Sequence, residues 1–316
     1  MSSLFDVTDS SAPDVAVEIA AGRVSGASIE WRGARASVVA HAVEPLPAAA
    51  LVPSLTAQNA LDRPSVMTAL NRVLEKIGRP RRVALVVPDA VAKVSLVRFE
   101  KVPPRAADLD QLVRWQVRKT APFPIEEAQV SHVRGMRFEE GHEFIVSLAR
   151  ASVIREYEAL CEEGGAHAGL VDIATFNVIN CALTGAIPDA STDWLLVNVA
   201  SDSVSIAILR GADLIFFRNR TADTEGTLAD LVHQTAMYYE DRLHGGGLTR
   251  ALLAGTSDHA DEIRTTLRNR LGTAVEPVDP RTAAALTDRI SASPAFLDAL
   301  VPLVGLLVRD RQAVPA

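Results

Sequence analysis

The sequence contains little of what marks several large classes of protein. It has only two cysteines in 316 residues, Cys161 and Cys181. Both stand among apolar residues with helical spacing, so we expect two buried thiols and neither a disulfide nor a metal site. The apolar run over 301–308 is far shorter than the roughly 20 residues that cross a bilayer, and Pro302 interrupts it. No membrane span is therefore expected.

The chain also lacks a basic excess, a secretory signal and the common enzyme motifs. Its net charge is -7 with a pI near 5.6, which argues against a nucleic-acid surface. Residues 1–13 have no basic segment followed by an apolar core, so they are expected to form a disordered leader of a cytoplasmic protein. No Walker loop, HExxH pair or CxxC is present, and 22–26 misses the spacing of a nucleophile elbow by one residue.

What the sequence does contain is a repeated pattern of strands and helices. Alternating apolar residues from Asp14 predict three antiparallel strands, and the stretch 194–220 predicts three more. Helix-strand units follow each meander, with helices expected near 152–161, 172–183, 224–243 and 295–309 and one capped by Ser257. Two halves that start alike indicate an internal duplication and an α/β fold with mixed sheets.

Four segments carry a further signal when they are taken together, namely VPDAVAKVSLVRFEKVP, LVRWQVRKTAPFPIEEAQVSH, LLVNVASDSVSIAILRGADLIFFRNR and DALVPLVGLLVRD. In this order they resemble a known family, the PilM family of the type IV pilus inner-membrane platform. The resemblance implies a two-lobed, actin-like and FtsA-like fold, in which the ribonuclease H-like unit is duplicated. It places the first lobe at 14–190, a small α+β subdomain inserted at about 97–151, and the second lobe at 191–316.

The resemblance also implies a function. Members of the family bind the cytoplasmic N-terminal peptide of PilN, a bitopic protein of the inner membrane. This chain is accordingly expected to be a cytoplasmic scaffold held at the inner membrane through a PilN-like partner. Self-association into an oligomer or ring is a further expectation that the sequence leaves open.

Proteins of this superfamily bind ATP between the lobes through two hairpins of Asp-x-Gly type and a glycine-bearing adenosine loop. Glycine lets backbone N–H groups approach phosphate, and the aspartates hold Mg²⁺ or orient water. Here Glu18 and Ala20 stand at the key positions of the first hairpin, and Asn198, Ala200 and Ser201 belong to the second. The adenosine loop retains Gly255. We therefore expect a degenerate site without catalysis, at which weak binding of ATP and Mg²⁺ stays open because Glu18 can ligate a metal.

The family resemblance places the partner peptide in a groove between the first lobe and its inserted subdomain. Trp115 and the segment Phe123, Pro124 and Ile125 are the expected lining, because rigid aromatic and proline surfaces lose little entropy when a peptide docks. Trp115 and Phe123 could equally close the core of the subdomain. Two other functions stay open: an active actin-like ATPase that uses Glu18 and Asn198 in altered roles, and a sugar or metabolite kinase, for which no catalytic base stands out.

Overall fold

The computed structural model describes residues 13–185, 189–221, 226–255, 260–287 and 293–309. The expected leader, apart from residue 13, and the expected helix cap at Ser257 lie outside the described residues. Within these ranges no helix is long and apolar enough to cross a bilayer.

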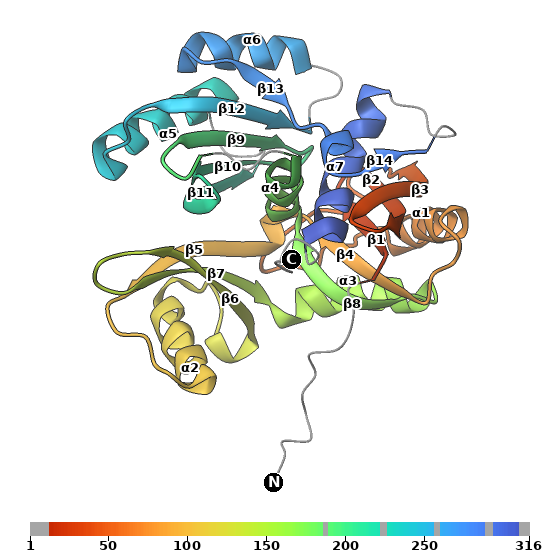
Figure 1. Cartoon of the computed structure of the whole chain (residues 1–316). Coiled ribbons are helices and arrows are strands. Elements are labelled where there is room, and N and C mark those ends of the chain that lie inside the picture. Colours follow the sequence, from red (N-terminus) through yellow and green to blue (C-terminus); the bar gives the residue numbers. More distant parts are fainter. Residues whose placement is uncertain (1–12, 186–188, 222–225, 256–259, 288–292, 310–316) are drawn as a thin grey trace.

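The first lobe is built on a six-stranded sheet with the strand order β14-β3-β2-β1-β4-β8 (Figure 1). Its first three strands form an antiparallel meander, and β4 and β8 then add in parallel to β1. The strands are β1 (Val15–Ala20), β2 (Arg23–Arg32), β3 (Arg35–Pro45), β4 (Arg82–Val87), β8 (His167–Ile173) and β14 (Ala285–Leu286).

The second lobe repeats this topology in a five-stranded sheet with the order β11-β10-β9-β12-β13. Again a meander of three antiparallel strands is followed by two strands that run parallel to its first strand. The strands are β9 (Asp193–Val199), β10 (Ser203–Arg210), β11 (Asp213–Thr221), β12 (Leu248–Ala254) and β13 (Val275–Pro277). The shared order confirms the predicted α/β fold with a duplicated unit.

Between β4 and β8 the chain forms a small subdomain, which we call the insert. It is a three-stranded antiparallel sheet in the order β5-β7-β6, with one helix packed on one face. Its elements are β5 (Ala92–Phe99), α2 (Ala106–Val117), the short helices η2 (Arg118–Thr120) and η3 (Ile125–Glu127), β6 (Ala128–Arg137) and β7 (His142–Arg150). The sheet thus begins at Ala92, before the predicted start of the insert at about residue 97.

Helices cover both faces of the two large sheets. Those of the first lobe are α1 (Arg63–Lys76) and α3 (Ala151–Glu163), and those of the second are α5 (Leu228–Leu243) and α6 (Ala260–Leu271). Between the sheets lie α4 (Ala174–Gly185) and α7 (Pro294–Val308) (Figure 1). The short helix η4 (Pro280–Thr282) contacts both of them, and the short helix η1 (Asp89–Val91) contacts β10 and β11.

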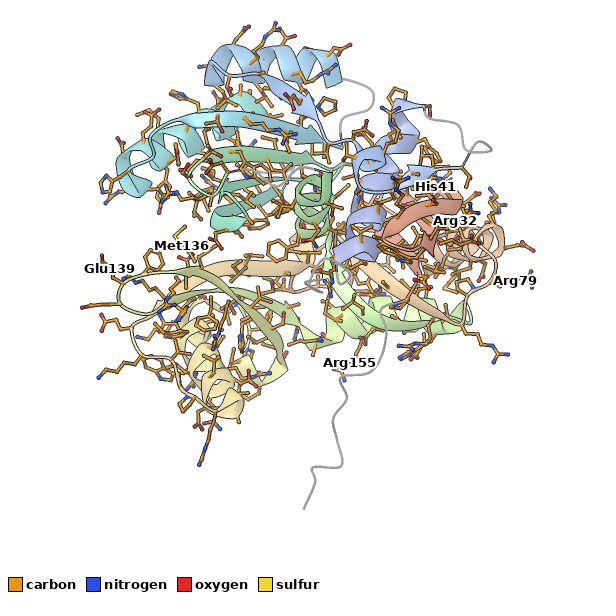
Figure 2. All side chains as sticks on the ribbon, viewed as in Figure 1. Arg32, His41, Arg79, Met136, Glu139 and Arg155 are labelled. Atoms are coloured by element: carbon orange, nitrogen blue, oxygen red, sulfur yellow. The ribbon has the colours of Figure 1, made fainter. Side chains whose placement is uncertain are left out.

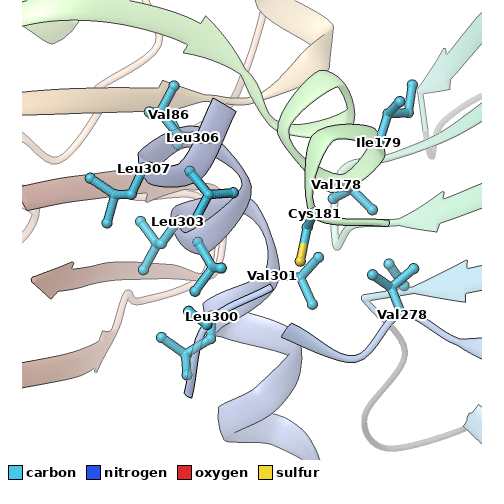
Figure 3. Packing of buried hydrophobic residues seen from close by; sticks show 14 of the residues in the cluster. Val86, Val178, Ile179, Cys181, Val278, Leu300, Val301, Leu303, Leu306 and Leu307 are labelled. Atoms are coloured by element: carbon cyan, nitrogen blue, oxygen red, sulfur yellow. The ribbon is translucent and has the colours of Figure 1, made fainter. Parts of the chain in front are cut away.

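Helix α7 joins the cores of both lobes. Leu303, Leu306 and Leu307 point toward the strands of the first sheet, while Val301 faces Cys181 of α4 (Figure 3). These residues belong to a buried cluster that also includes Trp194 of the second sheet. Because the apolar side chains of α7 cover the first sheet, burial keeps this C-terminal helix at the lobe interface.

The division of the chain therefore differs from the predicted boundary at residue 190. The predicted second lobe, 191–316, contains β14, which pairs with β3, and α7, which packs on β1 and β2. Both are elements of the first lobe in space. The sequence pattern cannot show this return, because periodicity reports which face of a helix is apolar and not which sheet covers it.

Candidate functional site

The two lobes enclose a cavity of about 340 Å³, which we call the interlobe cleft. It lies where the β1-β2 hairpin, the β9-β10 hairpin and the end of β12 converge. Helices α4, α6 and α7 complete the lining with apolar side chains and with Asp298 of α7. All the residues that the sequence nominated for nucleotide line it: Glu18, Ala20, Asn198, Ala200, Ser201 and Gly255.

Glu18 is already engaged by its own hairpin. Its side chain accepts a hydrogen bond from Ser25 Oγ at 2.9 Å and forms an ion pair with the Arg23 guanidinium at 3.0 Å. The residue is only 4% exposed. A Mg²⁺ ion would have to compete with Arg23 for this carboxylate, so Glu18 is a poor replacement for the aspartate of an active site.

The two hairpin turns meet across the cleft. A Cβ built on Gly22 would lie 3.5 Å from Ser201 Oγ, so a side chain larger than hydrogen at position 22 would contact the opposite turn. Gly255 is also placed by packing. Its φ is +80°, and a Cβ there would lie 2.0 Å from the Val199 carbonyl oxygen. Its retention therefore follows from close backbone approach and gives no support for a nucleotide.

Asn198 belongs to a buried polar network that sequence reasoning missed, which we call the Asp89 network. Asn198 Nδ2 donates to Thr175 Oγ1 at 2.9 Å. Thr175 in turn donates to Asp89 through both its hydroxyl and its backbone N–H, the latter at 2.9 Å. Ser205 Oγ donates to Asp89 at 2.6 Å and accepts from Asn219 Nδ2 at 2.9 Å. Burial raises the pKa of Asp89, while the donors Ser205 and Thr175 oppose that shift.

The sequence signal for Asp89 was weak. It follows the buried strand β4 directly, in the order Val87, Pro88, Asp89, and a polar residue at the end of a buried strand is a candidate for a site. Its partners Thr175 and Ser205, however, are 86 and 116 residues away along the chain. Only the fold brings them together.

The chemistry of the interlobe cleft does not match what Mg·ATP requires. Both hairpin positions that would serve the metal, Glu18 and Asn198, are committed to protein partners. Among the residues that the structure describes, no group of three or more His, Cys, Asp and Glu side chains could hold a metal ion. Burial raises the pKa of each cysteine thiol to about 12, so Cys161 and Cys181 are inert core residues rather than nucleophiles.

A second group of hollows follows the boundary between the insert and the first lobe, and we call it the junction cleft. Its parts have volumes of about 330, 560 and 80 Å³, and the second of them shares lining residues with each of the other two. Arg150 and Ser152 line the first two, and Gln129 lines the last two. Arg155, on the α3 side of this boundary, is labelled in Figure 2.

Arg150 organises the rim of the junction cleft. Its guanidinium donates to Glu127 at 2.7 Å and to the Thr56 carbonyl oxygen at 2.7 Å. It also lies 5.8 Å from the centre of the Phe123 ring. These contacts tie η3 and the loop before α1 to the start of α3, so the rim is held in place before any partner binds.

The residues nominated for peptide binding are divided by the structure. Trp115 is 64% exposed on α2. Phe123 and Ile125 pack, partly buried, in the core of the insert, and Pro124 is exposed next to them. None of the four lines the three hollows of the junction cleft. Ile125 is the first residue of the short helix η3, whose next two residues, Glu126 and Glu127, do line one of the hollows.

The smallest hollow is lined by one partly buried carboxylate. Asp172 of β8 lines it together with Ser131 and Ser147 of the insert. Burial raises the pKa of Asp172, and the guanidinium of Arg309, 2.5 Å away, partly offsets this effect. The hollow therefore combines hydroxyl groups with a carboxylate that is already paired.

Comparison with known proteins identifies the fold and the family. The profile of the family described as type IV pilus assembly protein PilM matches residues 17–242. A solved structure of a PilM-PilN type IV pilus biogenesis complex is 18% identical, with a TM-score of 0.78 over 95% of this chain and 98% of that chain. A Bacteroides thetaiotaomicron protein with an actin-like ATPase fold and unknown function is 11% identical, with a TM-score of 0.51 over 87% and 94% of the two chains. The structural matches establish a two-lobed actin-like fold, and because the family profile covers most of the sequence, the chain belongs to the type IV pilus assembly protein PilM family.

Proposed function

We propose that the chain is a non-catalytic scaffold of a type IV pilus platform that binds the N-terminal peptide of a PilN-like membrane protein in its junction cleft. In this role it lies in the cytoplasm and is held at the inner membrane through that partner. Membership of the PilM family and the likeness to the PilM-PilN complex support the choice of partner.

The observation that carries the proposal is the pair of sheet edges at the junction cleft. β6 is the outermost strand of the insert sheet, and β8 is the outermost strand of the first-lobe sheet. Gln129 and Ser131 of β6 and Val171, Asp172 and Ile173 of β8 line the same hollow. An edge strand offers main-chain donors and acceptors to an added strand, so an extended peptide suits this place.

Calorimetric titration with a synthetic N-terminal peptide of the PilN-like protein tests the proposal. Gln129 is exposed and lines two of the hollows, so Gln129→Trp should fill the cleft without disturbing the core. We expect this variant to bind the peptide at least tenfold more weakly, with an unchanged melting temperature.

Trp115→Ala is the matched comparison, because Trp115 is an exposed residue of the same insert outside these hollows. We propose that Phe123, Pro124 and Ile125 support the rim and that Trp115 contributes little. Full affinity of Gln129→Trp together with loss of affinity in Trp115→Ala would place the peptide on α2 and rule out the junction cleft.

An ATPase is the second candidate function, because all the nominated nucleotide residues do converge on one cavity. The contacts of Glu18 and Asn198 favour the scaffold. Titration with Mg·ATP should give no micromolar binding and no rise in melting temperature. Micromolar binding would show that the two hairpins separate readily, and a nucleotide-dependent mechanism would then replace the scaffold.

A further inference from the structure

The Asp89 network crosses from one lobe to the other. Asp89 follows β4, and Thr175 is the second residue of α4, so both precede the strands of the second lobe in the sequence. Asn198 lies in β9, Ser205 in β10 and Asn219 in β11, which are neighbouring strands of the second sheet. Two bonds, Asn198 to Thr175 and Ser205 to Asp89, therefore join the lobes directly beside the interlobe cleft.

The network is buried and its central carboxylate has its hydrogen bonds made. Asp89 is 5% exposed, Asn198 is 8% exposed, and Thr175 and Ser205 are fully buried. Asp89 Oδ1 accepts the Thr175 backbone N–H, and Asp89 Oδ2 accepts the hydroxyls of Thr175 and Ser205. A charge buried in this way is stabilised only while its donors stay in place, so separation of the lobes would leave it poorly solvated.

The direction of the hydrogen bonds explains the residue at position 198. The single proton of the Thr175 hydroxyl goes to Asp89, so this oxygen can only accept from its other neighbour. The Asn198 amide supplies the required N–H. An aspartate at position 198 would bring a second carboxylate against an oxygen that has no proton left to give.

We propose that the Asp89 network is a built-in staple between the lobes, which holds the interlobe cleft in one geometry without any ligand, and that Asn198 is the positioning residue whose amide makes the staple possible. Asn198, where the Asp-x-Gly pattern has an aspartate, therefore removes a metal ligand and at the same time adds a hydrogen bond between the lobes.

A polarity swap tests the staple. Asn198→Asp and Asp89→Asn should each lower the melting temperature by about 5 °C. The first places a carboxylate oxygen against the Thr175 oxygen, so that two acceptors meet, and the second places an amide NH2 among hydroxyl donors. In the double variant, the amide introduced at position 89 can donate to Thr175, while the Thr175 hydroxyl donates to the carboxylate introduced at position 198. The double variant should recover at least half of the summed loss, whereas additive losses would overturn the proposal.

A second experiment measures the distance between the lobes rather than the stability of the whole protein. Spin labels on Glu75→Cys of α1 and Glu240→Cys of α5 give the distance between lobes, and the native cysteines are too buried to react. The wild-type distance distribution should be narrow and should not change with Mg·ATP. Ser205→Ala, a mild change that removes one interlobe bond, should broaden it.

Asp193→Asn is the matched control. Asp193 is a buried carboxylate bonded to Arg210 and Tyr239, all within the second lobe. This variant should lose stability while its interlobe distance stays narrow. An unchanged distance distribution in Ser205→Ala would overturn the staple. Peptide binding is measured separately, so its presence or absence does not affect this result.

Discussion

Gly255 and Asn198 show that the residue type at a motif position depends on the contacts it makes with neighbouring elements. Gly255 keeps the expected glycine because the Val199 carbonyl oxygen leaves no room for a Cβ. Asn198 departs from the expected aspartate because Thr175 needs a donor there. The family resemblance nominated both positions for nucleotide, and both line the interlobe cleft. The sequence could not supply these reasons, since each depends on a contact with another element.

His41 gives the fold a dependence on pH. Burial, with the nearby charge of Arg23 as a smaller cause, lowers the pKa of His41 from 6.5 to about 4. Between these values the unfolded chain binds a proton that the folded chain does not, so stability falls as the pH falls below about 6.5. We expect a loss of about 1 to 3 kcal/mol between pH 7 and pH 4, measured by urea unfolding at each pH.

The surroundings of His41 make it a suitable residue for testing this dependence of stability on pH. His41 lies beside α7 (Figure 2), its ring 4.3 Å from that of Phe296, and its Nε2 atom is buried without a hydrogen-bond partner among the described residues. His41→Leu should remove most of the slope. The side chain of His167 is 66% exposed, so His167→Asn should leave the slope of stability against pH unchanged. An unchanged slope in His41→Leu would assign the acid sensitivity to other groups.

At the scale of elements, alternation and helical spacing were good guides where one face of an element is buried. Both meanders and the helices on either side of the sheets were predicted for this reason. β8 was missed because it is an edge strand with a mixed, half-exposed pattern, and the predicted helix from Asp172 took its last two residues. β14 has only two residues, which is too short for any periodic signal.

The crossing of α4 and α7 depends on one small residue. A Cβ on Gly305 would lie 1.7 Å from the Asn177 carbonyl oxygen. Helix propensity alone favours alanine over glycine by about 1 kcal/mol, but overpacking costs about 1 to 3 kcal/mol or more, so the clash should win. We expect Gly305→Ala to lower the free energy of unfolding by at least 1 kcal/mol, measured by chemical denaturation.

Gly246→Ala is the control for this crossing, because a Cβ at Gly246 meets nothing within 4 Å. Its free energy of unfolding should change by less than about 0.5 kcal/mol. If Gly305→Ala were instead more stable than the wild type, α4 and α7 would not be in close contact in solution.

At the scale of the whole molecule, the duplicated topology could be predicted from the repeated meander, but the path of the last helix could not. The sequence placed 191–316 in one lobe, whereas α7 fills the space between the sheets and β14 extends the first of them. A strongly apolar helix such as α7 shows that it is buried without showing where. Its location depends on which surface the rest of the fold leaves uncovered.

This arrangement predicts that the chain cannot be divided at residue 190 into two independent domains. A fragment of residues 1–190 lacks α7, so the surface around Ala16, Ala84 and Val86 would face water. We expect this fragment to unfold without a cooperative transition and to bind a dye for exposed apolar surface. Adding a peptide of residues 280–309, which carries β14 and α7, should restore a cooperative transition, because that segment supplies the missing cover. Cooperative unfolding of the fragment alone would show that α7 is dispensable to the first lobe, and the lobe boundary predicted from the sequence would then also be the folding boundary.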